Sequence, residues 1–510
     1  MLLNIILNRT QDNIIGINNE LLFHIKEDLE WFKKITTGHI VVMGYNTWKS
    51  LPIKPLKDRY NIVITNEHYD EFLEYEGEEC PDQVFRSYQE MIDYFFTSRS
   101  QGKVAGDGFR EEVTMFGSHS YLVEDPNIFI IGGSRLYEEA YQEGIVDTIY
   151  ETKCIINIEN CDDCFSICEN DKVTKCNLLI DKNNYEITYY KKSKSNVDVY
   201  HKVEGENKKR KKKELNYIFF IHQKKKSINQ CELQYLRLLN KVYSQGTERN
   251  TRNSIVKSSF GEKMTFNLIK GFPLLTSKKM GWKTILRELL WFINGSTNNK
   301  ELQEKNVHIW DENSSKEYME SRGLTYEEGE LGPIYGWQWR NFGGEYGVKE
   351  GKKGVDQIKY MINLIKTDPM SRRIILSSWN PPDLNKMALP PCHILFQIYV
   401  DGEFIDGQLY QRSGDMFLGV PFNIASYSFL LHIIGKVTNK KPRFLHHILG
   451  DCHIYSNHYK QVEEQLMNKT FNFPNIEIND ELTSIDTIKE SDINIINYQS
   501  NNSIKAVMIA

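Results

Sequence analysis

The sequence predicts an α/β domain with a mostly parallel central sheet and flanking helices, joined by a basic linker to a second, α+β domain. Three observations lead to this fold class. Strand-like and helical patterns alternate at first, a Lys-rich stretch follows, and long apolar helical patterns then mix with strand-like runs. A chain of 510 residues is also too long for one hydrophobic core. We therefore predict domains at 1–203 and 230–510, with the linker at 204–229.

Short apolar or β-branched runs mark the strands of the first domain, and apolar residues at helical spacing mark the helices between them. The expected strands are 2–7, 40–43, 61–65, 128–131 and 148–156. The expected helices are 26–35, 88–96 and 134–142. Residues 98–127 are rich in Gly, Ser and charge and predict a surface insertion, whereas the alternation at 185–203 predicts a final hairpin.

The predicted linker is strongly basic. Between Lys202 and Lys226 there are ten Lys or Arg and three Glu, although the whole chain has a net charge of −5. A solvated strap is the simplest interpretation. A nuclear-import or nucleic-acid patch is an alternative from composition, but the stretch lacks interleaved aromatic residues and a folded recognition element.

The second domain opens with a helical pattern at 232–243 and contains two segments apolar enough to be buried helices, 285–293 and 424–437. Strand-like runs at 373–378, 393–400 and 403–411 predict a second sheet.

Features at the N-terminus and the cysteines bear on compartment. Residues 1–7 are apolar but are interrupted by Asn4 and lack a basic flank, so they predict a buried strand and no signal peptide. No apolar run reaches the length of a membrane span. Nine cysteines without a secretion signal indicate a reducing, cytoplasmic location. The spacing of four of them lacks the paired knuckles of a zinc site, so we expect no metal: Cys161, Cys164, Cys168 and Cys176.

Three motifs of the first domain carry chemistry. Asp28 lies in the first turn of an amphipathic helix, with Leu29 and Phe32 as apolar neighbours. The run 42–48 follows a strand, and Gly132-Gly133 stands at a strand-to-helix junction. Such a glycine turn lets backbone N–H groups approach a pyrophosphate at a helix N-terminus.

In this order and spacing, the motifs resemble dihydrofolate reductase over about residues 1–203. The resemblance implies that Asp28, with a pKa raised by burial beside Leu29 and Phe32, binds the pterin and promotes protonation at N5, while NADPH delivers hydride to C6. Thr152 would support the pterin contact, and Arg59 would pair with the α-carboxylate of the glutamate tail. NADPH would be bound by Gly44, Thr47, Gly132, Gly133, Ser134 and Arg135, and the family's cis Gly-Gly bond would fall at Gly132-Gly133.

Three positions depart from the family pattern. Phe23 stands where Trp is usual, Asn8 stands where a small residue is usual, and Tyr45 occupies a position where a basic residue often lies near the 2′-phosphate. Lys49 or Arg135 would supply a positive charge instead.

Cys392 is the candidate nucleophile of the second domain. It follows two prolines, and a strand-like run that ends in Arg412 comes shortly after it. A cysteine alone is most often a small buried hydrophobe, but an adjacent arginine favours the nucleophilic thiolate. Four arginines stand inside such motifs and suit a phosphate dianion: Arg252, Arg372, Arg373 and Arg412.

This set resembles thymidylate synthase over about residues 230–510. The resemblance implies a homodimer in which Arg372 and Arg373 reach the partner's nucleotide. Cys392 would add to C6 of dUMP and make C5 nucleophilic toward 5,10-methylenetetrahydrofolate, while Glu288 and Tyr335 would manage proton transfers. The residues that would bind dUMP are Arg252, Arg372, Arg373, Arg412, Ser413, Asp415, Asn423, His453 and Tyr455. Those that would contact the folate are Trp310 and Asp415.

The order of the two domains resembles the bifunctional enzymes that join both activities. The synthase releases dihydrofolate as it makes dTMP for DNA synthesis, and the reductase returns that product to tetrahydrofolate. A third alternative for the basic linker, beside the solvated strap and the nucleic-acid patch, is that it steers anionic dihydrofolate between the sites. The alternative is an active synthase whose first domain is a degenerate reductase with a structural or interaction role; Asn8, Phe23 and Tyr45 favour it, and Asp28 and Thr152 count against it.

Overall fold

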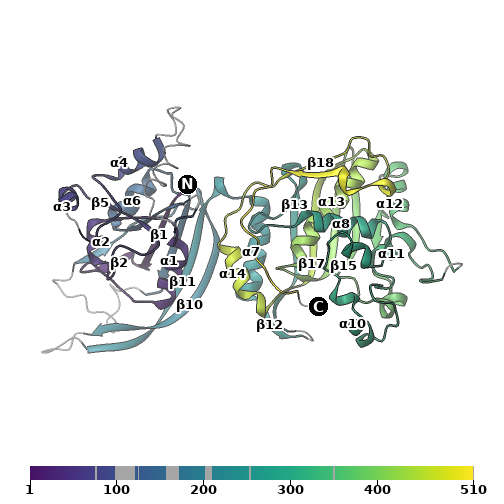
Figure 1. The fold of residues 1–510 in the computed structure, drawn as a ribbon, viewed down its shortest axis with the longest axis horizontal. Coiled ribbons are helices and arrows are strands. Elements are labelled where there is room, and N and C mark those ends of the chain that lie inside the picture. The colour runs from purple at the N-terminus through teal and green to yellow at the C-terminus, as the bar shows by residue number, and fades with distance from the viewer. Residues whose placement is uncertain are drawn as a thin grey trace. The chain divides into compact units, whose positions relative to one another are not determined.

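The chain folds into two compact units, Met1–Ser227 and Ile228–Ala510 (Figure 1). The structure is a computed structural model that describes residues 1–74, 77, 79–97, 121–123, 126–156, 172–201, 209–251, 254–348 and 351–508. The predicted insertion at 98–127 lies largely outside these residues.

An eight-stranded sheet forms the centre of the first unit, in the order β10-β11-β8-β1-β7-β4-β5-β6. All pairings from β8 to β6 are parallel, and β11 and β10 add an antiparallel edge, which confirms the predicted mostly parallel sheet. The strands are β1 (Leu3–Thr10), β4 (Ile40–Gly44), β5 (Tyr60–Ile64), β6 (Gln83–Phe85), β7 (Ile128–Gly132), β8 (Thr148–Cys154), β10 (Tyr185–His201) and β11 (Lys209–Lys224). A small sheet contains β2 (Ile14–Ile17), β3 (Glu20–Leu21) and β9 (Val173–Lys175).

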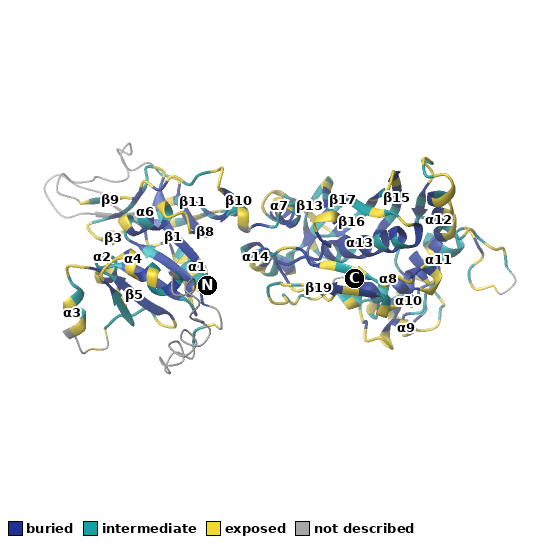
Figure 2. Cartoon of the chain, turned by 90° about the horizontal axis from the view of Figure 1, so that it is seen from above, coloured by how far each residue is buried: buried dark blue, intermediate teal, exposed yellow. Residues whose placement is uncertain are grey.

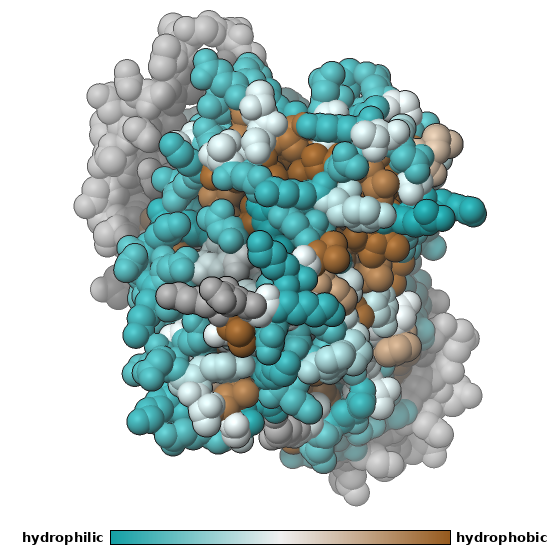
Figure 3. All heavy atoms as spheres, turned by 90° about the vertical axis from the view of Figure 1, so that its right-hand side faces the viewer, coloured by the Kyte–Doolittle hydropathy of each residue, from teal (hydrophilic) through white to brown (hydrophobic). Residues whose placement is uncertain are grey.

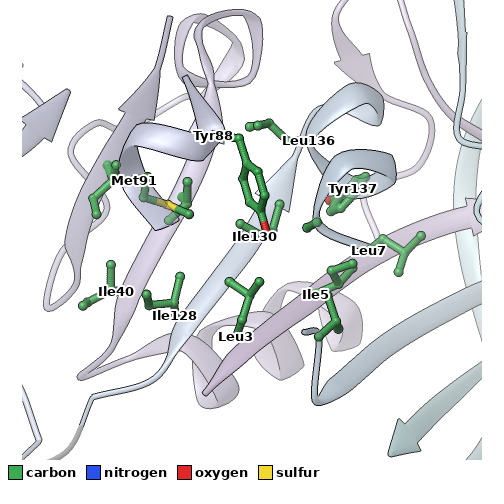
Figure 4. Close-up of a cluster of buried hydrophobic side chains, with 14 of the residues drawn as sticks. Leu3, Ile5, Leu7, Ile40, Tyr88, Met91, Ile128, Ile130, Leu136 and Tyr137 are labelled. Atoms are coloured by element: carbon green, nitrogen blue, oxygen red, sulfur yellow. The ribbon is translucent and has the colours of Figure 1, made fainter. Parts of the chain in front are cut away.

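Helices cover both faces of this sheet. They are α1 (Lys26–Thr36), α2 (Tyr45–Ser50), α3 (Tyr69–Glu74), α4 (Tyr88–Ile92), continued by a π-helical turn (Asp93–Thr97), and α6 (Ser134–Gln142). Figure 4 shows side chains of β1, β4 and β7 pointing toward those of α4 and α6 in one buried cluster. On the opposite face, Trp31 of α1 packs against Tyr150 and Phe219, with ring centroids 6.0 and 4.6 Å apart. Alternate residues of β1 and β8 therefore face different helices.

Strand β11 corrects the predicted linker. Residues 209–224 of the stretch 204–229 form this strand, which pairs with β8 and β10. The reason is the apolar alternation that follows the lysines, because Leu215, Tyr217, Phe219 and Ile221 are all buried. The first unit therefore extends to Ser227, beyond the predicted end at residue 203.

The second unit is built on a six-stranded sheet in the order β12-β13-β17-β16-β15-β14. Only the β16–β17 pairing in this sheet is parallel. The strands are β12 (Thr247–Asn250), β13 (Ile255–Asn267), β14 (Ile375–Ser377), β15 (His393–Asp401), β16 (Phe404–Asp415) and β17 (Lys441–Tyr455). A separate hairpin contains β18 (Asn475–Ile478) and β19 (Ile493–Ile496).

Two apolar helices lie in the core of the second unit, as the sequence predicted: α8 (Trp282–Ile293) and α13 (Gly419–Thr438). The dark blue of Figure 2 marks both as buried. Because α13 is apolar around most of its circumference, neighbouring elements enclose it. The other helices are α7 (Gln230–Gln245), α9 (Lys300–Gln303), α10 (Lys316–Ser321), α11 (Tyr335–Asn341), α12 (Gln357–Thr367) and α14 (Tyr459–Met467).

Candidate functional site

A carboxylate with two protein donors lies where α1 meets the first sheet. Asp28 Oδ1 accepts a hydrogen bond from Thr152 Oγ1 at 2.5 Å, and Oδ2 accepts one from Asn8 Nδ2 at 2.8 Å. Asn8 and Thr152 are register partners on β1 and β8, so both side chains leave the same face of the sheet. The structure therefore brings Asp28 and Thr152 together, as the sequence predicted.

Burial raises the pKa of the Asp28 carboxyl, and the hydrogen bonds from Thr152 and Asn8 offset part of this increase. The direction is the one predicted. Leu29 contributes less to the burial than expected, because its side chain is 45% exposed.

A guanidinium group packs against the same helix, farther from its N-terminus than Asp28. Asp28, Phe32 and Thr36 follow at four-residue spacing and share one face of α1. Arg59 is buried, its Nε donates to Thr36 Oγ1 at 2.8 Å, and its guanidinium carbon is 5.6 Å from the Phe32 ring centroid. A carboxylate, an aromatic ring and a guanidinium therefore follow one another along this face.

The predicted glycine turn brings two helix N-termini together. Gly133 is the N-cap of α6 and Gly44 that of α2, and neither helix has a side-chain cap. A Cβ on Gly44 would lie 3.9 Å from Gly133 N, so the two caps are adjacent. At Gly132, where φ is +154°, a Cβ would approach Thr47 Oγ1 to 2.7 Å. The junction of β4 and β7 with these helices thus brings two helix N-termini without side-chain caps close together, which favours an anion.

The remaining reductase-like positions lie near this turn. The Gly132–Gly133 peptide is cis, as the resemblance implied. Ser134 is the first residue of α6, and the exposed Arg135 pairs with Glu139 at 2.8 Å.

The three departures from the family pattern have different surroundings. Phe23 is buried, and Asn8 bonds to Asp28. Tyr45 stacks on His68 with ring centroids 3.7 Å apart, and the Lys49 ammonium lies 4.8 Å from the Tyr45 ring centroid. A positive charge therefore stands beside Tyr45.

In the second unit, Cys392 precedes β15 and is held by backbone contacts. Its amide N–H donates to Tyr335 Oη at 2.7 Å, and its carbonyl accepts the Arg412 amide N–H at 2.8 Å. The Arg412 guanidinium donates to the carbonyls of Pro390 and Pro391 at 3.0 and 2.8 Å. The two prolines therefore anchor the arginine beside the cysteine.

Opposing effects act on the ionisation of Cys392. Burial raises the pKa of the thiol, whereas Arg412 and the Tyr335 hydroxyl lower it, and the net direction is upward. Arg412 therefore acts on the thiol in the direction that the sequence predicts. The predicted neighbours are present, but desolvation outweighs them.

Glu288 lies on α8 within the same aromatic cluster. Trp310 Nε1 donates to Glu288 Oε1 at 2.7 Å. Burial raises the pKa of Glu288 to about 7, while the Trp310 hydrogen bond acts in the opposite direction. The Trp310 and Tyr335 ring centroids are 6.1 Å apart, so packed side chains connect Glu288 to the Tyr335 that bonds with Cys392.

Several predicted nucleotide-binding residues meet at the carboxyl ends of β16 and β17. These two strands run parallel, with Asp415 in register with His453 and Ser413 two residues earlier on β16. The His453 and Tyr455 rings are 5.1 Å apart. Asn423 lies on α13, close to Asp415. A Cβ on Gly419 would be 4.0 Å from Asn423 Oδ1 and 3.7 Å from Asp415 Cβ. Ends of parallel strands that meet in this way commonly form binding sites.

Two other predicted phosphate arginines lie near the edge of the sheet. Arg372 and Arg373 are exposed in the turn before the edge strand β14. Arg252 lies outside the described residues. Arg249, three positions earlier, pairs with Asp451 at 2.6 Å.

One contact near Cys392 was not predicted. The His393 ring stacks on Tyr335 with centroids 4.1 Å apart, and His393 Nδ1 lies 2.8 Å from Tyr427 Oη. Burial lowers the pKa of His393 to about 3, so the imidazole is neutral at neutral pH. His393 directly follows Cys392, and Tyr427 lies four residues after Asn423. Their places in these two motifs were the sequence signal that could have predicted the contact.

The described residues contain no group of three or more His, Cys, Asp or Glu arranged to hold a metal ion. Within the same part of the chain, no helix combines the length and apolar character needed to cross a membrane. Cys161, Cys164 and Cys168 lie outside it, whereas Cys176 is buried.

Comparison with known proteins links both units to enzyme families. Residues 2–109 match the dihydrofolate reductase family, and residues 233–510 match the thymidylate synthase family. A bifunctional dihydrofolate reductase-thymidylate synthase from Zea mays is 36% identical, covering 98% of this chain and 95% of its own length. The bifunctional proteins of Paramecium tetraurelia and Plasmodium chabaudi are each 35% identical, covering 99% and 92% of this chain and 98% and 83% of their own lengths.

Proposed function

The chain belongs to the family of bifunctional dihydrofolate reductase–thymidylate synthases, and we propose that each unit performs one of the two reactions. The first unit reduces dihydrofolate with NADPH, and the second converts dUMP to dTMP with 5,10-methylenetetrahydrofolate. One observation carries the synthase assignment, namely the contact of Cys392 with both Tyr335 and Arg412. The carboxylate of Asp28, held by Thr152, supports the reductase assignment.

In the synthase reaction, Cys392 Sγ forms a bond with C6 of dUMP, and C5 then attacks the methylene carbon of the folate. A base then takes the C5 proton, the bond between the transferred carbon and the folate nitrogen breaks, and a hydride from the folate completes the methyl group, so that the folate leaves as dihydrofolate. The bond between sulfur and C6 breaks as dTMP is released. Because the free thiol has a raised pKa, Arg412 and Tyr335 act by stabilising the thiolate as it forms.

Glu288 and Tyr335 manage protons in this reaction. A carboxyl group with a pKa of about 7 is close to half protonated at neutral pH, so it gives and takes a proton with little bias. The hydrogen bond from Trp310 holds its orientation, and the same indole ring would contact the folate.

The carboxyl ends of β16 and β17 would bind the nucleotide. Asn423 would read the uracil edge, since a carboxamide offers one donor and one acceptor side by side. His453 and Tyr455 would hold the ribose, and Asp415 would contact the folate beside it. The residues that would bind the phosphate are Arg252, Arg372, Arg373, Arg412 and Ser413.

In the reductase unit, Asp28 binds the pterin and promotes protonation at N5. Its raised pKa suits this role near neutral pH. Phe32 and Leu29 would flank the substrate, and the Arg59 guanidinium would pair with the carboxylate of the glutamate tail. The order of carboxylate, ring and guanidinium along α1 supports this orientation.

The glycine turn fits NADPH. The adjacent, uncapped N-termini at Gly44 and Gly133 offer N–H groups to a pyrophosphate. Gly132 lets Thr47 pack against the turn, where any Cβ would meet its hydroxyl. Ser134 and Arg135 begin the helix on this anion-favouring side. When bound, NADPH supplies the hydride for C6 of the pterin.

The two reactions are chemically linked, because the second unit releases the dihydrofolate that the first unit reduces. The alternative of a degenerate reductase is not favoured, since relatives with both activities in their names match nearly the whole chain. The contacts of Asp28 with Thr152 and of Arg59 with α1 also fit an active site.

The synthase unit would act as a homodimer. Arg372 and Arg373 face solvent on the single chain, which leaves them free to reach a partner's nucleotide. Figure 3 shows apolar side chains gathered between hydrophilic ones on one face, as at many interfaces. The free cysteines of the described part, six in number, fit a reducing, cytoplasmic location.

Two assays on the full chain test both functions. One follows dihydrofolate formation from dUMP and methylenetetrahydrofolate, and the other follows NADPH loss with dihydrofolate. We expect Cys392→Ala to abolish the first reaction and keep the second, and Asp28→Asn to do the reverse. Cys231→Ala, at a half-buried cysteine of α7, is the matched control and should keep both.

A wild-type chain that consumes no NADPH with dihydrofolate would overturn the reductase proposal and support the degenerate domain. Synthesis of dTMP by the Cys392→Ala variant would overturn the synthase mechanism.

A further inference from the structure

We propose that Asn8 is a positioning residue of the reductase site, which stabilises the ionised form of Asp28 and fixes its orientation toward the substrate. The inference rests on the proposed reductase function and adds a residue to its machinery. Asn8 replaces the small residue usual at this position, and its carboxamide reaches the carboxylate directly.

The geometry makes Asn8 the counterpart of Thr152. The two residues pair in register on neighbouring parallel strands and approach Asp28 from the same sheet face. Thr152 Oγ1 donates to Oδ1 at 2.5 Å, and Asn8 Nδ2 donates to Oδ2 at 2.8 Å. Each oxygen of the carboxylate therefore has its own protein donor, and rotation of the group about its Cβ–Cγ bond would break both contacts.

The orientation of the Asn8 amide is itself held by a neighbour. Cys154 Sγ lies 3.3 Å from Asn8 Oδ1 and donates to it. Burial raises the pKa of the Cys154 thiol far above its usual value, so the group keeps its proton and stays a donor. With Oδ1 occupied by Cys154, Nδ2 is the atom that faces Asp28. A proton on Asp28 Oδ2 would present a donor to the Asn8 donor, so Asn8 disfavours protonation at that oxygen.

This arrangement leaves a defined acceptor surface for a ligand. A carboxylate offers about two lone pairs on each oxygen, and the protein uses one on each. The two that remain suit a ligand with adjacent N–H donors, such as the amino group and ring N–H of a pterin. Asn8 thus orients the acceptors before the substrate arrives.

Other titratable groups also face Asp28. Glu27, its neighbour on α1, raises the pKa of Asp28 and is itself bound by Ser193 and Tyr217. Tyr137 from α6 has a strongly raised pKa through burial, and so remains neutral. In the described part of the chain, the side chains that donate to the Asp28 carboxylate are those of Asn8 and Thr152.

The test is a titration of the Asp28 carboxyl by carbon NMR in the full chain labelled at aspartate, with the signal assigned by Asp28→Asn. In Asn8→Ala, we expect the proton affinity of Asp28 to rise by about tenfold, because a hydrogen bond to a charged group is lost. Asn8→Ser removes the carboxamide that makes the contact and should shift the titration in the same direction. Asn216→Ala removes an exposed amide of β11 and should leave the titration unchanged.

A second readout separates positioning from folding. The pH profile of kcat/KM for dihydrofolate should move in the same direction as the NMR titration in Asn8→Ala, and not in Asn216→Ala. Coincident titrations for the wild type, Asn8→Ala and Asn8→Ser, all folded by circular dichroism, would overturn the role of Asn8. Because the titration needs no turnover, an inactive wild type would defeat the proposed reductase function alone.

Discussion

Each proposed site contains a buried carboxyl group whose pKa is raised by desolvation. Burial raises the pKa of Glu288 to about 7 and also raises that of Asp28. Each group keeps a donor that favours its ionised form, Trp310 for Glu288 and Thr152 for Asp28. Glu288 is therefore poised between its two protonation states near neutral pH, as proton transfer requires, and burial moves the pKa of Asp28 in the same direction.

The pH dependence of the synthase reaction should follow Glu288. The carboxyl is mostly protonated below pH 7 and mostly ionised above it, so we expect an inflection near pH 7 in the kcat profile. Glu288→Gln should remove the inflection and lower kcat by about 100-fold or more. Trp310→Phe removes the hydrogen bond that favours the ionised form, so its inflection should lie at higher pH.

Glu312→Gln, at an exposed carboxyl of the second unit, is the control and should reproduce the wild-type profile. An unchanged inflection in Glu288→Gln would show that another group titrates.

Some residues of the two sites can be recognised from short sequence motifs, whereas the contacts of others depend on the fold. Asp28, Cys392 and the glycine turn stand in motifs and are evident in the sequence. The hydrogen bond from Asn8 depends on the register between β1 and β8, which no local pattern reveals. The raised pKa of Cys392 depends on how deeply distant segments enclose it, which the nearby arginine in the sequence does not reveal.

At the scale of elements, β11 joins its sheet through a buried ion-pair network. Glu151 of β8 accepts from Arg9 Nε of β1 at 2.7 Å and lies 2.9 Å from His222 Nε2 of β11. Burial alone would raise the pKa of Glu151, but His222 and Arg9 lower it to about 2. The network therefore connects three neighbouring strands of the sheet.

This network should stabilise the first unit in a pH-dependent way. The pKa of Glu151 is lower in the folded chain than the ordinary value of 4.5. Its contribution is therefore present above about pH 4.5 and is lost as the pH falls toward 2. We expect Glu151→Gln to cost about 3 kcal/mol in the free energy of unfolding at pH 7, and progressively less in acid.

Urea unfolding of the wild type and of Glu151→Gln at several pH values measures the difference in their free energies of unfolding. Glu214→Gln on β11 breaks only an exposed pair with Lys194 and should cost at most about 0.5 kcal/mol. A cost for Glu151→Gln that does not shrink in acid would contradict this account.

Elements with one dominant pattern were predicted well. The helix at 134–142 and the strands of the parallel core match the structure within a few residues. In β11, the basic residues 209–213 led to the linker prediction, although an apolar alternation typical of a strand follows them. Strands β13 and β17 were missed because one face of β13 is exposed and β17 mixes histidine and charged residues with its apolar positions.

At the scale of the whole molecule, the proposed homodimer means that each synthase site would need two chains. If Arg372 and Arg373 bind the partner's nucleotide, a mixed dimer of Cys392→Ala and the double variant Arg372→Ala/Arg373→Ala contains one intact site. Equal mixing with subunit exchange should restore about a quarter of wild-type activity from two inactive proteins. dTMP formation before and after exchange measures it.

If the arginines serve their own chain, no site in the mixture is intact and activity stays absent. Size-exclusion chromatography of each variant controls for dimer formation.

The two-unit architecture was predictable from the change in composition along the chain, whereas the boundary at residues 227 and 228 depended on the pairing of β11 with β8.

Formation of a bond between Cys392 and a pyrimidine is the step on which the assignment depends. Mass spectrometry of the chain after incubation with 5-fluoro-dUMP and methylenetetrahydrofolate measures it most directly. We predict a ternary adduct on the peptide that contains Cys392, present in Cys231→Ala and absent in Cys392→Ala. Folded, dimeric protein that leaves this peptide unmodified would contradict the mechanism.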